Sequence, residues 1–368
     1  MDRRSLSVAI LGSRGIPNRY GGFEAFAEEL GAGLAARGHR VMVYTVSDHP
    51  VRDEYWKGVK RVLVSNPERK LGTFGQFIYD LNCNLHSRKE PIDIILHLGY
   101  TSDSVWYWLW KKNCVHIVNM DGQEWKRSKY NRPVRAFLRL AERLATIRSN
   151  RLVADSPEIE RYLQSKYKVP VSYIAYGARV PADFAPEMLR EWGLRPGGYD
   201  LVVARMEPEN HIEQAIVAKI ASENPLPLVI VGNANKYKSI LQARYDQQEN
   251  IRFPDAIYDQ EKLNSLRHFS RLYIHGHSVG GTNPSLLEAM ACGCRIVAHA
   301  NPYNRYVLGE EACYFSSSAE LSAYFNNFDA WPFNRLVSQN LARIRKEYNW
   351  EMITDAYEEL FYDATGIR

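Results

Sequence analysis

The sequence predicts an α/β protein built from two parallel-sheet domains, and three observations carry this prediction. The chain has 368 residues, of which 45% are hydrophobic and 24% are charged. This length exceeds what a single hydrophobic core usually holds, and the composition is that of a globular protein. A strand–helix–strand unit opens the chain, and a second series of apolar strands and helices begins at Asp200. Such alternation is typical of parallel sheets.

The first domain begins with a complete strand–helix–strand unit. Ser7–Gly12 is a β-branched run that ends in glycine and predicts a buried parallel strand. Phe23–Arg37 has an apolar stripe at helical spacing, and Gly38 ends this helix. Arg40–Thr45 predicts the next strand. Further elements of this domain are predicted as strands over Ile92–Leu98, Val115–Asn119 and Arg151–Ala154 and a helix over Pro133–Ile147.

The second domain opens on the predicted strand Asp200–Arg205. Its other strands are predicted at Leu228–Gly232, Leu272–Ile274 and Arg295–Ala298. Leu286–Ala291 is predicted to lie on a helix that Gly293 ends. Val337–Asp363 predicts one or two amphipathic helices. We therefore place the domains at 1–178 and 179–345, followed by a C-terminal helix at 346–368.

Charge, cysteine content and hydropathy exclude several classes of protein. The net charge of +5 is too small to indicate a nucleic-acid partner. The five cysteines form no paired metal-binding pattern, and we expect reduced thiols in a cytoplasmic protein. No apolar stretch reaches the roughly 18–20 residues that a membrane-spanning helix needs. The N-terminal apolar run is too short for a signal peptide.

The first candidate site is the loop Ser13–Glu24, which joins the first strand to the first helix. Ligands of doubly wound sheets bind at such turns, where a helix N-terminus meets the sheet edge. Gly21 and Gly22 would let backbone N–H groups approach an anion, and Arg14 and Arg19 add positive charge. The loop is not GxGxxG, which disfavours an NAD-dependent dehydrogenase. The alternative is a purely structural turn.

Two further segments carry candidate anion-binding groups in the second domain. Arg205 ends a strand, where its guanidinium could pair with a diphosphate; the alternative is a plain surface arginine. The turn His275–Asn283 leads into a helix that starts near Pro284, and exposed N–H groups there suit a phosphate. Glu288, one turn further, could accept hydrogen bonds from ribose hydroxyls, unless it is a surface glutamate. Two alternate histidines without a third ligand predict no metal.

The order and spacing of these motifs resemble glycosyltransferase family 4, of the GT-B fold, and within it the rhamnosyltransferase-like group. The resemblance covers nearly the whole chain. It implies two Rossmann-like domains that face each other across a cleft, with a C-terminal helix that crosses back to the first domain. The segments that carry it are Gly12–Pro17, Tyr20–Glu24, Asn119–Arg127, Val153–Ser156, Gly280–Ser285 and Tyr348–Trp350.

The resemblance implies a retaining glycosyltransferase that needs no cofactor and no metal. The donor would be a nucleotide-diphosphate sugar, dTDP-rhamnose, bound mainly by the second domain. The acceptor would be a lipid-linked saccharide of a cell-surface polysaccharide pathway, bound mainly by the first. The chain has no Asp-x-Asp pair, in keeping with metal independence. The alternatives are a sugar-nucleotide 2-epimerase of the same fold and a non-catalytic nucleotide-sugar-binding partner.

Site residues follow from the resemblance, with two departures. Arg205 matches a diphosphate-binding arginine and Glu288 a ribose-binding glutamate. The broader family has a glutamate in place of Gly280 and a lysine in place of Asn210, so other groups must stabilise the leaving diphosphate. The full donor set is Arg14, Gly21, Gly22, Arg205, Asn210, Gly280, Gly281, Thr282, Asn283 and Glu288. The acceptor side is Tyr20, Phe23, Glu24 and Glu124.

Asp121 and Asp155 are the candidate catalytic carboxylates. Asp121 lies in a glycine turn after a strand and could accept the proton of the acceptor hydroxyl or orient that hydroxyl. Asp155 lies in an Ala-Asp-Ser-Pro segment, where an aspartate can instead cap a helix. Asp121 is therefore the first candidate and Asp155 the second.

A basic amphipathic segment predicts contact with an anionic membrane. Residues 126–151 contain nine Lys or Arg and one acid, Glu142. Aromatic residues cluster nearby in Trp106–Lys112, and such a helix beside aromatic side chains is typical of an interfacial surface. We expect a cytoplasmic protein on the inner face of the membrane; the alternative is a core-packed helix with a solvated basic face. The predicted apolar stripe is Val134, Phe137, Leu138, Ala141 and Leu144.

Overall fold

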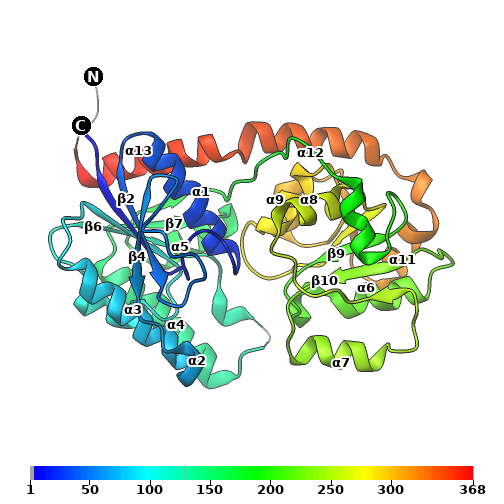
Figure 1. Ribbon diagram of the computed structural model, residues 1–368, viewed down its shortest axis with the longest axis horizontal. Coiled ribbons are helices and arrows are strands. Elements are labelled where there is room, and N and C mark those ends of the chain that lie inside the picture. The colour runs from blue at the N-terminus through cyan, green and yellow to red at the C-terminus, as the bar shows by residue number, and fades with distance from the viewer. Residues whose placement is uncertain (1–3, 128, 368) are drawn as a thin grey trace. The chain divides into compact units, whose positions relative to one another are not determined.

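The computed structural model describes residues 4–127 and 129–367. The chain divides into two compact units (Figure 1). The first unit comprises Met1–Lys126, Tyr130–Tyr176 and Trp350–Arg368, and the second comprises Arg127–Lys129 and Gly177–Asn349. The last helix of the chain therefore belongs to the first unit, as the predicted fold requires.

The first unit is built on a sheet of eight strands, counted over the described residues, in the order β3-β4-β2-β1-β5-β6-β7-β8. β3 pairs antiparallel with β4, and the other neighbouring pairs are parallel. The strands are β1 (Ser7–Leu11), β2 (Arg40–Val46), β3 (Tyr55–Trp56), β4 (Val59–Val64), β5 (Ile94–Leu98), β6 (Val115–Asn119), β7 (Arg151–Ala154) and β8 (Val171–Tyr173).

Helices cover both faces of this sheet, which explains why its central strands β1 and β5 are buried along their whole length and mainly apolar. In Figure 1, α1 and α13 lie on one side of the strands and α3 and α4 on the other. The helices are α1 (Gly22–Ala36), α2 (Glu68–Leu71), α3 (Thr73–Ser87), α4 (Arg132–Arg148), α5 (Pro157–Lys166), α13 (Trp350–Thr365) and the 3-10 turns η1 (Ser104–Leu109) and η2 (Glu124–Lys126).

The C-terminal helix α13 packs on α1 through aromatic rings and a close backbone approach. The Phe26 ring lies 5.3 Å from the Tyr357 ring and 5.8 Å from the Trp350 ring. A Cβ at Gly33 would lie 2.7 Å from the Thr354 hydroxyl oxygen, so only glycine lets the two helices approach this closely. α13 is therefore part of the core of the first unit.

The second unit holds a parallel sheet of six strands over the described residues, in the order β11-β10-β9-β12-β13-β14. The strands are β9 (Asp200–Val203), β10 (Leu228–Val231), β11 (Ile251–Arg252), β12 (Leu272–His275), β13 (Ile296–His299) and β14 (Cys313–Phe315). The helices and 3-10 turns are η3 (Pro186–Trp192), η4 (Pro208–Asn210), α6 (Ile212–Ile220), α7 (Lys236–Arg244), α8 (Gln260–His268), α9 (Pro284–Ala291), α10 (Pro302–Leu308), α11 (Ser318–Asn326), η5 (Phe328–Ala330) and α12 (Phe333–Glu347).

The structure confirms the α/β class and corrects some elements. The predicted strand at Ile92–Leu98 begins at Ile94. The sequence analysis missed β4, because Val59–Val64 mixes charged with apolar residues, and it missed α3. The C-terminal segment forms two helices, which Tyr348 and Asn349 separate.

Candidate active site

The loops that follow β9 and β12 meet at the carboxyl edge of the second sheet. The two strands are parallel neighbours, so the segments that follow them leave the sheet side by side. A Cβ at Gly276 would lie 2.0 Å from the Asn210 carbonyl oxygen, so only glycine admits this contact between the two loops. This edge carries most of the predicted donor-binding residues.

Arg205 lies in the loop after β9 and is exposed. Its carbonyl oxygen accepts hydrogen bonds from the Glu207 backbone N–H at 2.8 Å and from the Asn210 side-chain amide at 2.7 Å. Within the described parts of the chain, the guanidinium makes no hydrogen bond or ion pair. The backbone of Arg205 is thus held while its five N–H donors face solvent, as an anion-binding group requires.

Asn210 joins Arg205 to His277, a residue whose role the sequence analysis missed. Its side-chain N–H donates to the Arg205 carbonyl, so its amide oxygen must accept the hydrogen bond of 2.8 Å from His277 Nδ1. Burial lowers the pKa of His277, which favours the uncharged ring. A Cβ at Gly280 would lie 3.6 Å from His277 Nε2. Asn210 and Gly280, the two positions that depart from the pattern of the resembled family, therefore flank one buried histidine.

The turn before α9 is fastened to the end of β9. Asn283 caps the helix, because its side chain accepts the Ser285 backbone N–H at 2.9 Å. The Ser285 hydroxyl donates to the Val203 carbonyl at 3.1 Å and lies 2.8 Å from the Tyr273 hydroxyl. Gly281 and Thr282, the residues before the cap, are buried. The positive end of α9 is therefore held at the same sheet edge as Arg205.

Glu288 is held by Arg267, which the sequence analysis also missed. Arg267 Nη2 lies 2.5 Å from Glu288 Oε2, and the exposed fractions of the two side chains are 1% and 28%. Burial disfavours the charge on Arg267, but the Glu288 carboxylate outweighs it, so the pKa of Arg267 is raised. Glu288 is thus held in an ion pair, with part of its surface open to a ligand.

In the first unit, the loop after β1 is held by an ion pair, a cation–π contact and a buried carboxylate. The Arg14 guanidinium forms two bonds with Glu68, at 2.6 and 3.2 Å, and lies 3.7 Å above the Tyr20 ring. The buried Glu24 carboxylate accepts the Arg14 backbone N–H at 2.7 Å, and a Cβ at Gly21 would lie 3.5 Å from Glu24 Oε2. A carboxylate therefore lies beside Gly21, one of the two glycines predicted to receive a phosphate.

A cavity of about 130 Å³ opens beside this loop. Its wall combines cationic, acidic and aromatic side chains, and burial raises the pKa of the Glu24 carboxyl. Such mixed polarity suits hydroxyl groups better than a diphosphate. The lining residues are Arg14, Gly15, Arg19, Tyr20, Glu24, Val46, Asp48, His49 and Pro50.

Asp121 follows β6 and has a left-handed backbone, with φ of 51°. Its N–H donates to the Asn119 side-chain oxygen at 3.0 Å, and the Asn119 side-chain N–H donates to the Tyr357 hydroxyl of α13 at 3.1 Å. The Glu124 backbone N–H donates to the Tyr100 hydroxyl at 3.2 Å. α13 thus helps to hold the loop that carries both Asp121 and Glu124.

Asp155 does not cap α5, which corrects the alternative considered for it. The cap is Ser156, whose hydroxyl accepts the Ile159 backbone N–H at 3.3 Å. Asp155 is buried at the end of β7, a direct neighbour of β6. Both candidate carboxylates therefore follow adjacent strands of the first sheet.

The predicted site residues fall into two sets. The second unit holds Arg205, Asn210, Gly280, Gly281, Thr282, Asn283 and Glu288, all after β9 or β12. The first unit holds Arg14, Tyr20, Gly21, Gly22, Phe23, Glu24, Asp121, Glu124 and Asp155. Arg14, Gly21 and Gly22, which we predicted to bind the donor, thus belong to the same unit as the predicted acceptor residues.

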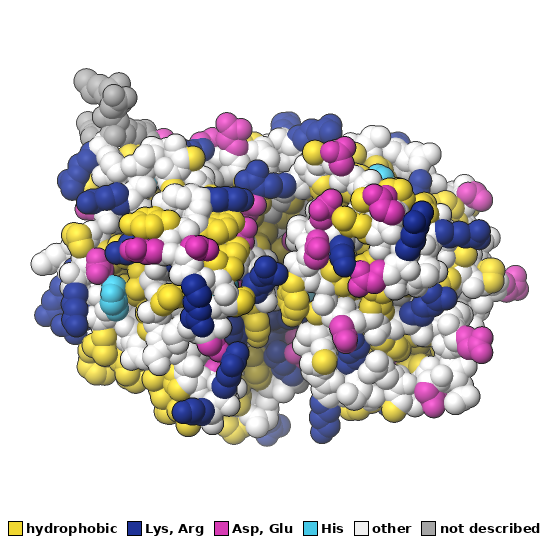
Figure 2. Space-filling model, viewed as in Figure 1, with side chains coloured by type: hydrophobic (Ala, Val, Ile, Leu, Met, Phe, Trp, Pro, Cys, Tyr) yellow, Lys and Arg dark blue, Asp and Glu magenta, His cyan; other side chains and the backbone are white. Residues whose placement is uncertain are grey.

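In the apolar stripe predicted for α4, Val134 is 37% exposed, and Phe137 and Leu144 are partly buried. Leu138 and Ala141 are buried, whereas Leu140 and Ile147 are 51% and 53% exposed. The fold thus brings a different set of apolar side chains to the surface. Phe74 of α3, at 64% exposed, belongs to this set. In Figure 2, hydrophobic side chains lie beside Lys and Arg over the part of the first unit where Figure 1 labels α2 and α3.

Among the helices that the structure describes, none combines the length and the apolar character that crossing a bilayer demands.

Two family matches divide the chain. Residues 5–179 match a domain of unknown function, DUF1972. Residues 198–327 match the family Glycosyl transferases group 1. No curated protein matches the chain. The second match covers the whole sheet edge that carries Arg205 and Glu288.

Solved structures resemble the chain over nearly its whole length. Sucrose-phosphate synthase from Thermosynechococcus elongatus has a TM-score of 0.81 at 16% identity, over 99% of this chain and 100% of that chain. HepE from Anabaena, in complex with UDP and glucose, has a TM-score of 0.76 at 14% identity, over 97% and 100%. The catalytic domain of starch synthase IV from Arabidopsis thaliana, bound to ADP and acarbose, has a TM-score of 0.74 at 14% identity, over 99% and 100%.

These likenesses confirm the predicted GT-B fold with its two Rossmann-like domains. The match of residues 198–327 confirms the predicted enzyme class, a glycosyltransferase.

Proposed function

We propose that the protein transfers a sugar from a nucleoside diphosphate to a saccharide acceptor, with retention of the anomeric configuration. The observation that carries the proposal is the sheet edge of the second unit, which lies within the glycosyltransferase match. There the guanidinium of Arg205, which has no partner among the described residues, follows β9, and the partly exposed Glu288 follows β12 on α9. Arg205 suits a diphosphate and Glu288 suits ribose hydroxyls.

In the proposed reaction, the bond between the anomeric carbon and the phosphate oxygen breaks, and the nucleoside diphosphate leaves. The acceptor hydroxyl oxygen forms the new bond to the same face of that carbon. Its proton passes to the leaving phosphate oxygen, while the Asp121 carboxylate orients the hydroxyl by accepting a hydrogen bond. Arg205 and the amides before α9 stabilise the charge of the departing diphosphate, so no metal or cofactor is required.

For the donor, we propose dTDP-rhamnose, on the strength of the sequence resemblance. The structural neighbours hold related ligands, since HepE was solved with UDP and starch synthase IV with ADP. For the acceptor, we propose a lipid-linked saccharide whose hydroxyls enter the cavity beside Glu24 in the first unit. The mixed charge of that cavity supports an acceptor role for the loop rather than a donor role.

Glu288→Gln is expected to weaken binding of the donor nucleoside diphosphate by about 1–2 kcal/mol, through loss of a charged hydrogen bond to ribose. Glutamine keeps an oxygen that can accept from Arg267, so the buried arginine stays paired and the fold is preserved. Calorimetric titration measures the affinity, with the exposed Glu223→Gln of the same unit as control. Equal affinities for the wild type and Glu288→Gln would remove Glu288 from the ribose site.

We further propose that the first unit binds the cytoplasmic face of an anionic membrane, where a lipid-linked acceptor resides. The exposed apolar side chains are Phe74, Trp108, Leu140 and Ile147, at 64%, 57%, 51% and 53% exposed. The α4 residues Arg132 and Arg143 are exposed cations. The Phe77 ring, 6.2 Å from Phe74 and 5.8 Å from Phe137, connects α3 to α4, so both helices contribute to one surface. Apolar side chains among cations suit a lipid interface.

The double variant Arg132→Glu/Arg143→Glu is expected to weaken binding to vesicles of anionic lipid at least about 30-fold, because each surface cation contributes about 1 kcal/mol. Arg139 is left in place because it lies over the Trp125 ring. The matched control is Arg40→Glu/Lys168→Glu, with the same change of charge at exposed positions outside this surface. Equal binding by both double variants in vesicle sedimentation would leave α4 as a solvated helix.

A further inference from the structure

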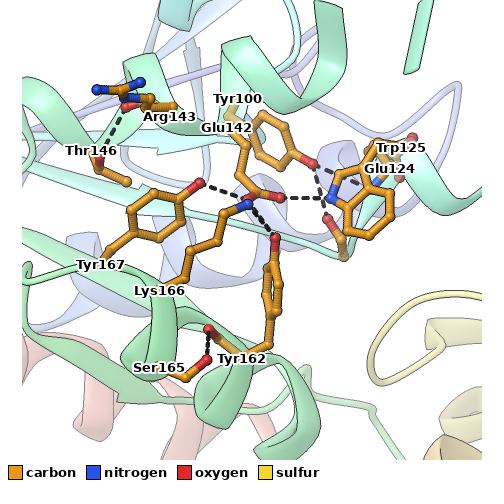
Figure 3. A network of polar contacts seen from close by, with 11 residues as sticks. Tyr100, Glu124, Trp125, Glu142, Arg143, Thr146, Tyr162, Ser165, Lys166 and Tyr167 are labelled. Atoms are coloured by element: carbon orange, nitrogen blue, oxygen red, sulfur yellow. Dashed lines mark hydrogen bonds and ion pairs between the residues drawn. The ribbon is translucent and has the colours of Figure 1, made fainter. Parts of the chain in front are cut away.

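Glu142 is a buried carboxylate in the middle of the basic helix α4. Its side chain is 1% exposed, and it is the one acid among residues 126–151. A buried carboxylate is costly unless donors satisfy its oxygens. The structure supplies those donors from outside α4, and Figure 3 shows them converging on Glu142.

Among the described residues, four side chains donate to this carboxylate. Trp125 Nε1–H donates to Oε2 at 3.0 Å. The Tyr162 hydroxyl, the Lys166 ammonium and the Tyr167 hydroxyl each reach Oε1 at 2.7 Å. Three of the donors belong to α5 and the residue after it, and only Trp125 belongs to the loop after β6. We name these five residues the Glu142 cluster.

The loop that carries Asp121 and Glu124 is therefore held at two points. On one side, the Tyr100 hydroxyl donates to the Gly122 carbonyl at 3.3 Å and accepts the Glu124 backbone N–H at 3.2 Å. On the other side, Glu142 holds the indole of Trp125, the residue next to Glu124. Figure 3 shows Trp125 and Glu124 adjacent, with Glu142 facing the indole nitrogen.

Trp125 is well suited to transmit this restraint. Its ring lies 6.4 Å from the Tyr162 ring and has the Arg139 guanidinium 4.4 Å above it. Asp121 has a left-handed backbone, which is uncommon outside glycine although aspartate is among the residues that tolerate it. The loop thus depends on fixed neighbours to present the Asp121 carboxylate in one orientation.

We propose that Glu142 is a positioning residue for the transfer reaction, which acts through Trp125 to hold the Asp121–Glu124 loop in its acceptor-binding conformation. The inference rests on the proposed function for the role of that loop. Glu142 itself is too deeply buried to touch a substrate. Small displacements of a positioned group reduce turnover strongly. Loss of the Trp125 hydrogen bond should therefore lower kcat and leave donor binding unchanged.

Three variants separate positioning from general destabilisation. Trp125→Phe removes the one donor that links Glu142 to the loop. Tyr162→Phe removes a donor to the same carboxylate from the α5 side. Trp106→Phe makes the same substitution as the first variant at a tryptophan whose indole N–H donates to the Phe77 carbonyl at 2.9 Å, outside the Glu142 cluster.

Trp125→Phe is expected to lower kcat about 10-fold, with the KM for the donor unchanged. It should also accelerate hydrogen exchange in peptides covering residues 120–127 by a similar factor. Tyr162→Phe and Trp106→Phe should stay within about twofold of the wild type in both measurements. Equal effects of all three variants, or no effect of Trp125→Phe, would overturn the proposal. If the wild type transfers no sugar, the proposed function fails, and the exchange measurement alone decides whether Glu142 holds the loop.

Discussion

Replacing Arg205 by alanine is expected to reduce kcat about 100- to 1,000-fold, the usual cost of removing a preorganised donor from a developing negative charge. The expectation follows from the state of this side chain. Its guanidinium is exposed and has no hydrogen-bond or ion-pair partner among the described residues, while its backbone is held by Asn210. The substitution therefore removes no internal contact of the guanidinium, and the melting temperature should stay unchanged.

Steady-state kinetics with the nucleotide sugar test this prediction. Arg190→Ala, at another exposed arginine of the second unit, is the control and should keep wild-type kcat. Arg205→Lys should recover part of the lost rate, because lysine keeps the charge but not the two-pronged geometry. The assay is run with and without a chelator, since the account predicts the same rate in both. A wild-type kcat for Arg205→Ala, or a rate abolished by the chelator, would contradict the role given to Arg205.

Asp121→Asn is expected to lower turnover about 100-fold, because a reacting hydroxyl displaced by about 1 Å can lose that much rate. Asparagine adopts a left-handed backbone at least as readily as aspartate, so the loop should keep its shape. The negative charge that orients the acceptor hydroxyl is lost. Affinity for the nucleoside diphosphate should not change, because Asp121 belongs to the first unit and Arg205 and Glu288 to the second.

The parallel variant Asp155→Asn decides between the two carboxylates. Asp155 lies at the end of β7, beside the strand that leads to Asp121. We expect Asp121→Asn to have a lower kcat than Asp155→Asn. A larger loss of kcat in Asp155→Asn, with near wild-type rates for Asp121→Asn, would exchange their roles.

Elements with a continuous apolar pattern could be predicted from the sequence. β1, β2 and β9 are buried on both faces, so each appears in the sequence as a nearly continuous apolar run. Such a run is recognisable without any alternation of polar and apolar residues. β4 escaped because Lys60 and Arg61 interrupt it. The buried Arg61 is tolerated because its guanidinium donates to the Ile16 carbonyl at 2.6 Å. That partner is far away in the sequence, so the contact could not be predicted. β8 and β14 were too short to show a pattern.

The surface-exposed side of α4 could be predicted only in part. Its apolar residues occur on two sides of the helix, and a helical pattern alone does not tell which side packs on the protein. Leu138 and Ala141 turned inward, while Leu140 and Ile147 turned outward. The single acid of this basic segment, Glu142, could have indicated which side of α4 is buried. Its carboxylate is 1% exposed and lies on the side of α4 that packs on neighbouring elements.

Candidate site residues were predicted where a strand ends in glycines and polar residues, and the structure places Arg205 and Glu288 at one sheet edge. Their supporting partners could not be predicted. Arg267 is one of many arginines, and nothing in its local sequence sets it apart from a surface residue. His277 belongs to the site through its hydrogen bond to Asn210, which is 67 residues away in the sequence. Such side-chain contacts arise only from the three-dimensional fold.

The central claim is that the second unit binds a nucleoside diphosphate at Arg205 and Glu288. The most direct test is thermal unfolding of the wild-type protein with a panel of nucleoside diphosphates and nucleotide sugars. One nucleoside diphosphate and its sugar conjugate should raise the melting temperature selectively, since a ligand at 100 times its Kd adds about 2.7 kcal/mol to the free energy of unfolding. We expect this to be the thymidine nucleotide. An unchanged melting temperature with every member of the panel would contradict the account.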